Sequence, residues 1–135
     1  MNPQDTFADV QQSFQRCLTR KEFLKRFYDI FMASHPDVPK LFAKTDFDTQ
    51  IRLLRHGLSA SIAFAGGTRV GAHVLERIGD THGRGKMNID PKLYPYWMDS
   101  LVRTVEETDP RYTPALGARW REALGIAISY IRGSR

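Results

Sequence analysis

The chain has 135 residues, 41% of them hydrophobic, which is enough to bury the core of one domain without disulfides or metal ions as staples. Its single cysteine rules out an internal disulfide framework, and no segment has the roughly 20 apolar residues of a membrane span. The net charge of +5 would suit nucleic acid, but basic residues are interleaved with acidic and apolar ones, so we expect one cytoplasmic domain over residues 1–135 that binds none.

Apolar residues recur with a helical period from the start of the chain, and no alternating strand pattern is evident. We expect a first helix over about residues 5–18. Its apolar face would be formed by Phe7, Val10, Phe14 and either Cys17 or Leu18, which predicts a buried thiol and a reducing compartment. Thr19 and Glu22 have the spacing of a capping box, so a second helix should begin near Arg20. The core face of that helix would carry Phe23, Phe27, Ile30 and Phe31, with Leu24 and Tyr28 beside them.

The stretch SHPDVPKLF predicts a corner with a short helix, in which Pro36 takes the first helical position and Phe42 closes the corner. Thr45 or Asp46 would then cap a helix of about twenty residues that stops at Gly66 and Gly67. Its apolar face would consist of Phe47, Ile51, Leu54, Leu58 and Ile62.

A shorter helix is expected over about residues 68–82, with Gly71, Leu75, Ile78 and His82 in one line. Asp90 and Pro91 form a cap and first turn for the next helix, which Asp109 and Pro110 end. Thr113 and Pro114 start the last one. The apolar positions of these two helices are Leu93, Tyr94, Trp97, Leu101, Val102 and Val105, then Leu116, Trp120, Leu124, Ile128 and Ile131. The chain is therefore predicted to be all-α.

His82 stands out because its ring would point inward with Ile78. A histidine at a helix end is usually a cap or a charge placed against the helix dipole. An inward neutral ring, however, needs a partner for each nitrogen, and a metal ion is one such partner. The remaining histidines and Cys17 show no zinc-binding pattern, whereas haem iron requires only one imidazole from the chain. The sequence thus points to His82 as a haem ligand.

Three segments, FYDIFMASHPDVPKLF, LERIGDTH and IDPKLYPYWMDSLV, resemble bacterial globins, above all single-domain globins, the globin portion of flavohaemoglobins and globin sensors. The resemblance covers nearly the whole chain. It implies a globin-like fold of about six to eight helices that enclose a cleft for haem b, iron protoporphyrin IX.

Residue by residue, the resemblance makes His82 the proximal iron ligand and Phe42 the ring that stacks on the porphyrin. Tyr28 matches a distal tyrosine whose hydroxyl donates to a gas bound at the iron. Both aromatic residues could instead be ordinary core.

Gln50 is the candidate for a second distal donor, with Leu54 one turn later over the haem. A shift of register would put Arg52 or Leu53 there instead. Ile78, Tyr94 and Trp97 would line the pocket, and each is equally consistent with plain core.

The expected function is reversible binding of oxygen, and also NO and CO, by a carrier, scavenger or gas sensor that is a monomer or homodimer. One alternative is a nitric oxide dioxygenase that depends on a separate reductase, because the chain has no Gly-rich dinucleotide motif. The segment SYIRGSR also lacks the acid that flavohaemoglobins use to polarise the proximal histidine. The third possibility is a haem-less regulatory module that signals through a partner.

Overall fold

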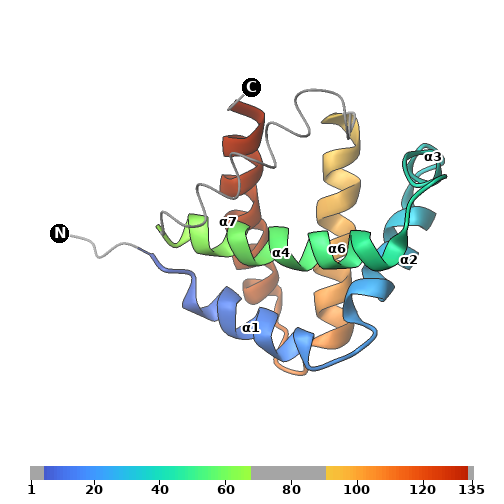
Figure 1. Ribbon diagram of the computed structural model, residues 1–135. Helices are drawn as coiled ribbons and strands as arrows, with labels where there is room; N and C mark the ends of the chain where they lie inside the picture. Colours follow the sequence, from blue (N-terminus) through green and yellow to red (C-terminus); the bar gives the residue numbers. More distant parts are fainter. Residues whose placement is uncertain (1–4, 68–90, 134–135) are drawn as a thin grey trace.

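The computed structural model describes residues 5–67 and 91–133, and of residues 131–133 only the main chain. These residues form six α-helices, one 3-10 turn and no strand, as an all-α globin fold requires (Figure 1). The elements are α1 (Ala8–Leu18), α2 (Phe23–Ser34), α3 (Val38–Leu41), α4 (Phe47–Ala65), the 3-10 turn η1 (Pro91–Leu93), α6 (Tyr94–Thr108) and α7 (Pro114–Gly133). The helix predicted over residues 68–82 lies outside the described residues.

The long helices pack in two crossed directions. α6 runs beside α7, while α4 crosses α7 and packs against α2 at its other end (Figure 1). α1 packs against both α6 and α7, and α2 packs against α6. Among the described helices, none combines the length and the apolar character needed to cross a lipid bilayer.

The first two helices begin later than predicted. Phe7 has φ 54°, in the left-handed region, and its amide donates to Asp5 Oδ1 at 2.8 Å, so α1 begins only at Ala8. The predicted capping box is wrong, because the Thr19 hydroxyl donates back to the Arg16 carbonyl at 2.7 Å. Thr19 therefore closes the end of α1, and α2 begins three residues after Arg20.

The other helix ends follow the predicted signals more closely. α4 begins after Asp46, whose Oδ1 accepts from the Asp48 amide at 3.1 Å, and ends just before Gly66. The Thr113 hydroxyl accepts from the Leu116 amide at 3.1 Å at the start of α7. In the corner, however, it is Pro39 and not Pro36 that lies in the first turn of α3.

The core is aromatic around α2, and the predicted apolar faces of α1 and α2 are confirmed. Phe27 stacks on Phe31 with ring centroids 5.5 Å apart and meets Trp97 of α6 edge-on at 5.8 Å. Cys17 of α1 is fully buried, and burial raises the pKa of its thiol to about 12. The fully enclosed large side chains also include Phe23, Leu58, Ile62, Leu93, Leu101, Trp120 and Leu124.

A buried carboxylate connects α1 to the corner between α6 and α7. Asp109 accepts hydrogen bonds from Ser13 Oγ at 2.6 Å and from Arg16 Nε at 2.7 Å, and its Oδ1 caps the Arg111 amide at 2.9 Å. Ser13 in turn accepts from the indole nitrogen of Trp120 at 2.9 Å. Burial by itself would raise the pKa of Asp109, but these hydrogen bonds outweigh it and lower the pKa to about 2.

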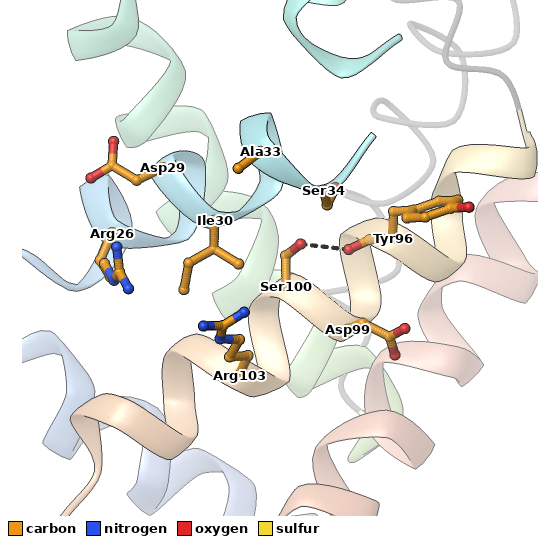
Figure 2. Close-up of a pocket in the computed structure, with 9 residues that line it drawn as sticks. All are labelled: Arg26, Asp29, Ile30, Ala33, Ser34, Tyr96, Asp99, Ser100 and Arg103. Atoms are coloured by element: carbon orange, nitrogen blue, oxygen red, sulfur yellow. Dashed lines mark hydrogen bonds between the residues drawn. The ribbon is translucent and has the colours of Figure 1, made fainter. Parts of the chain in front are cut away.

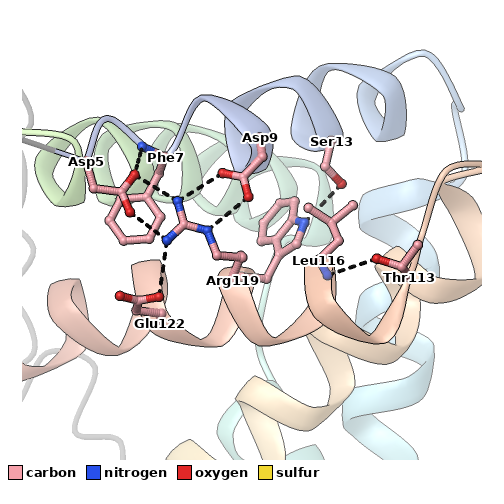
Figure 3. A network of polar contacts seen from close by, with 9 residues as sticks. Asp5, Phe7, Asp9, Ser13, Thr113, Leu116, Arg119 and Glu122 are labelled. Carbon is pink, nitrogen blue, oxygen red and sulfur yellow. Dashed lines mark hydrogen bonds and ion pairs between the residues drawn. The ribbon is translucent and has the colours of Figure 1, made fainter. Parts of the chain in front are cut away.

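A second polar cluster holds the N-terminal residues against α7 (Figure 3). The Arg119 guanidinium donates to Asp5 at 2.6 Å, to Asp9 at 2.9 Å and to Glu122 at 3.2 Å, and it lies 4.4 Å from the Phe7 ring centroid. These contacts place the main chain before α1 over the end of α4, where a Cβ added to Gly66 would lie 2.6 Å from the Thr6 carbonyl oxygen.

We predict that Asp109→Asn lowers the free energy of unfolding by about 2 kcal/mol at neutral pH, because it removes the charge that Arg16 and Ser13 stabilise. Since the folded pKa of about 2 lies below the ordinary value of 3.8, this stabilisation is present above pH 3.8 and is lost as the pH falls towards 2. Denaturant unfolding across that range should show the wild type and the variant converging. Asp29→Asn, an exposed acid on α2, is the control, and an equal loss there would contradict the assignment.

Gly66→Ala should destabilise the fold by about 1–3 kcal/mol, because the new methyl group meets main-chain atoms that cannot move aside as a side chain would. Gly125→Ala is the matched control in α7, where a Cβ meets nothing within 4 Å. The better helix propensity of alanine should stabilise that variant by about 0.5–1 kcal/mol. Thermal unfolding of both variants distinguishes the two effects, and a neutral Gly66→Ala would refute the close contact.

Candidate functional site

Tyr28 lies in a cage of aromatic rings from three consecutive elements. Its side chain, 6% exposed, projects from α2. Phe42 at the end of α3 and Phe47 at the start of α4 meet the Tyr28 ring edge-on, with centroids 5.6 and 5.5 Å away. Phe27, the preceding residue on α2, does the same at 5.0 Å. We call Tyr28, Phe27, Phe42 and Phe47 the tyrosine cage.

Local sequence signals put the two later rings of the cage in place. The short helix α3 ends at Leu41, and the amide of the next residue, Phe42, donates to the Pro39 carbonyl at 3.1 Å. Four residues later Asp46 caps α4, so Phe47 becomes the first residue of that helix. This tight connection brings Phe42 and Phe47 within 5.8 Å of each other, beside the same tyrosine.

Within the described part of the chain, the Tyr28 hydroxyl has a single, distant hydrogen-bond partner. It lies 3.5 Å from the main-chain oxygen of Gln50, at the outer limit for a hydrogen bond and well beyond the usual length for a hydroxyl donor. Burial raises the pKa of Tyr28 to about 12, and the neighbouring Gln50 lowers it only in part. The phenol is therefore neutral at physiological pH and keeps its proton available for donation.

The register of α4 distinguishes among the residues that the sequence left open. Gln50 is half-buried beside Tyr28, and Leu54, one turn later, is buried against the core. Arg52 and Leu53 are exposed, the latter by 53%, and Arg52 donates to Thr49 on the surface. The structure thus brings Tyr28, Phe42 and Gln50 together and leaves Arg52 and Leu53 outside.

The predicted pocket residues of α6 are Tyr94 and Trp97. Trp97 is half-buried and meets Phe27 rather than Tyr28, with ring centroids 5.8 Å apart. Tyr94, the first residue of α6, is also half-buried. Trp97 therefore reaches the tyrosine cage through Phe27. Ile78 and His82 lie outside the described residues, so their predicted roles stay predictions.

Phe47 is the member of the site that sequence reasoning missed. It was expected only as a core residue of α4, yet its ring contacts both Tyr28 and Phe42. A signal was present in the sequence. Phe47 precedes Gln50 by three residues and Leu54 by seven, so all three share one face of the helix.

The residues present fit a flat apolar cofactor that carries a polar ligand. Phe42 supplies an aromatic surface, and Tyr28 supplies a buried donor without a close acceptor. Within residues 5–67 and 91–133, no three His, Cys, Asp or Glu side chains gather to hold a metal ion. His82, the residue predicted to bind the haem iron, lies outside that range.

The fold has a counterpart among solved structures. The crystal structure of a protein from Pseudomonas aeruginosa PAO1, described as structurally highly homologous to a human haemoglobin, superposes with a TM-score of 0.89. The two sequences are 32% identical, and the match covers 96% of this chain and 98% of the other. Comparison with family models and with curated proteins gives no match. With this identity over nearly the full length of both chains, the present chain belongs to the globin family.

Proposed function

We propose that this globin binds haem b through His82 and uses Tyr28 to hold oxygen, and also NO or CO, at the iron. Family membership supports a haem protein with a diatomic gas ligand. The observation that carries the finer proposal is the Tyr28 hydroxyl, which is buried among aromatic rings with its nearest acceptor 3.5 Å away. A buried donor in that state costs free energy unless a ligand completes its hydrogen bonding.

Haem, when bound, supplies an iron atom at which a diatomic gas can be held. The chain supplies the surroundings. Phe42 offers its ring to one face of the cofactor, and the rest of the tyrosine cage keeps water away from the phenol. In such a low-dielectric environment, a hydrogen bond from a neutral donor to a partly charged acceptor is stronger than in water. The expected consequence is tight binding and slow release of oxygen.

The remaining predicted residues take supporting roles in this proposal. Gln50 is a second donor near the gas, while Leu54, Ile78, Tyr94 and Trp97 form apolar walls. We expect one domain that acts in the cytoplasm as a monomer or homodimer. Kinship with the globin portion of flavohaemoglobins or with globin sensors stays a prediction from the sequence motifs, as do the roles of carrier, scavenger and sensor.

Tyr28→Phe should raise the rate of oxygen release about ten-fold or more, because it removes a charge-assisted hydrogen bond and keeps the ring. Stopped-flow displacement of oxygen by carbon monoxide measures this rate. Tyr96→Phe is the matched control, since Tyr96 lies on α6 and is 39% exposed. An oxygen release rate that is unchanged in Tyr28→Phe would rule out Tyr28 as the distal donor.

His82→Ala should remove the axial ligand and, with it, the wild-type absorbance spectrum of the haem in both oxidation states. The expected result is weak haem retention and a changed Soret band in the reduced carbon monoxide complex. His56→Ala serves as the control, because His56 is exposed on α4. If His82→Ala retains haem with the wild-type spectrum, another residue holds the iron.

A further inference from the structure

A groove of about 370 Å³ runs between α2 and α6 on the outside of the molecule (Figure 2). Its walls are two helical stripes. Arg26, Asp29, Ile30, Ala33 and Ser34 come from α2, and Tyr96, Asp99, Ser100 and Arg103 come from α6. The volume lies in the range of small-molecule sites. The groove uses the opposite side of α2 from Tyr28, so it is separate from the tyrosine cage.

The floor of the groove is formed by Ile30 of α2 and Ser100 of α6, which lie between the charged side chains of its walls. Ile30 is 9% and Ser100 3% exposed. The Ser100 hydroxyl donates to the Tyr96 carbonyl at 2.6 Å, within its own helix (Figure 2). This internal bond satisfies the hydroxyl proton, and Ile30 with the neighbouring Ala33 supplies the carbon surface of the groove.

Two guanidinium groups from opposite walls share a single carboxylate. Arg26 Nε of α2 lies 3.2 Å from Glu107 Oε1, and Arg103 Nε of α6 lies 3.6 Å from Glu107 Oε2. All three side chains are at least 39% exposed, and ion pairs of this kind contribute little to stability. The cluster carries one positive charge in excess, which a second carboxylate can neutralise.

The acids that line the groove do not compete for this charge. Asp99 is paired with Arg121 of α7 at 2.7 Å. In Figure 2 the carboxylates of Asp29 and Asp99 both point outward, away from Ile30 and Ser100. At the far end stands Tyr96, whose ring meets His35 at 4.9 Å and forms an aromatic wall.

We propose that this groove binds a small amphipathic carboxylate, such as a medium-chain fatty acid. Its carboxylate lies between Arg26 and Arg103 and accepts from the guanidinium N–H groups that do not face Glu107. Its hydrocarbon chain lies on Ile30 and Ala33 and points towards Tyr96. The assignment does not depend on haem, so it can be true or false independently of the proposed gas binding.

Titration of the full chain with hexanoate, followed by amide chemical shifts in NMR spectra, tests the assignment. Saturable shifts should cluster on α2 and α6 around the groove. Acetate, which has the charge without the chain, and hexanol, which has the chain without the charge, should both bind more weakly. No saturable shift with hexanoate, or acetate binding as tightly as hexanoate, would overturn the proposal.

Two pairs of variants separate a built site from a general effect of charge. Arg103→Gln should weaken hexanoate about five-fold, while Arg55→Gln, exposed on α4 outside the groove, should change it less. Glu107→Gln should strengthen hexanoate about five-fold, because it frees both guanidinium groups. Glu106→Gln removes the same charge at the adjacent exposed position and is the control for Glu107→Gln. Equal responses within either pair would show that only net charge matters and would refute the site.

Discussion

The arrangement of this globin depends on the burial of one face of α2. Its buried residues, Phe23, Leu24, Phe27, Tyr28, Ile30 and Phe31, form one broad continuous face of the helix. This face packs against α6, α3 and α4, while the opposite side of the helix is exposed. This burial fixes the rotation of α2 about its axis, since any turn would expose a large aromatic ring.

With its rotation fixed, α2 serves two regions at once. Tyr28 is directed into the tyrosine cage, where Phe42 and Phe47 restrict the positions of its ring. Two residues later, Ile30 forms part of the floor of the outer groove. Phe27 contacts both Tyr28 and Trp97, so the core of the molecule separates the two regions with closely packed rings. The Tyr28 hydroxyl is in this way held within an apolar core by its closely packed neighbours.

The sequence predicted the faces of the helices well and their beginnings less well. Periodicity identified the buried residues because burial depends on which residues share a face. The start of α2 was wrong because the Thr19 hydroxyl found a nearer acceptor in Arg16. The start of α1 is shifted because Phe7 takes a left-handed conformation beside Asp5, a residue that Arg119, more than a hundred residues away, also contacts. The groove could not be predicted from the sequence either, because it forms where residues of α2 and α6, far apart along the chain, lie side by side. Of the site, sequence motifs found Tyr28, Phe42 and Gln50, but the role of Phe47 required the geometry.

The burial of the Cys17 thiol simplifies site-specific labelling of this globin. Because that sulfur is fully covered and holds its proton firmly, maleimide dyes and nitroxide spin labels would find no native target in the folded chain. A cysteine engineered at any chosen outer position would then be the one place where a probe attaches. Distances between helices can thus be measured by fluorescence or electron spin resonance without first replacing Cys17.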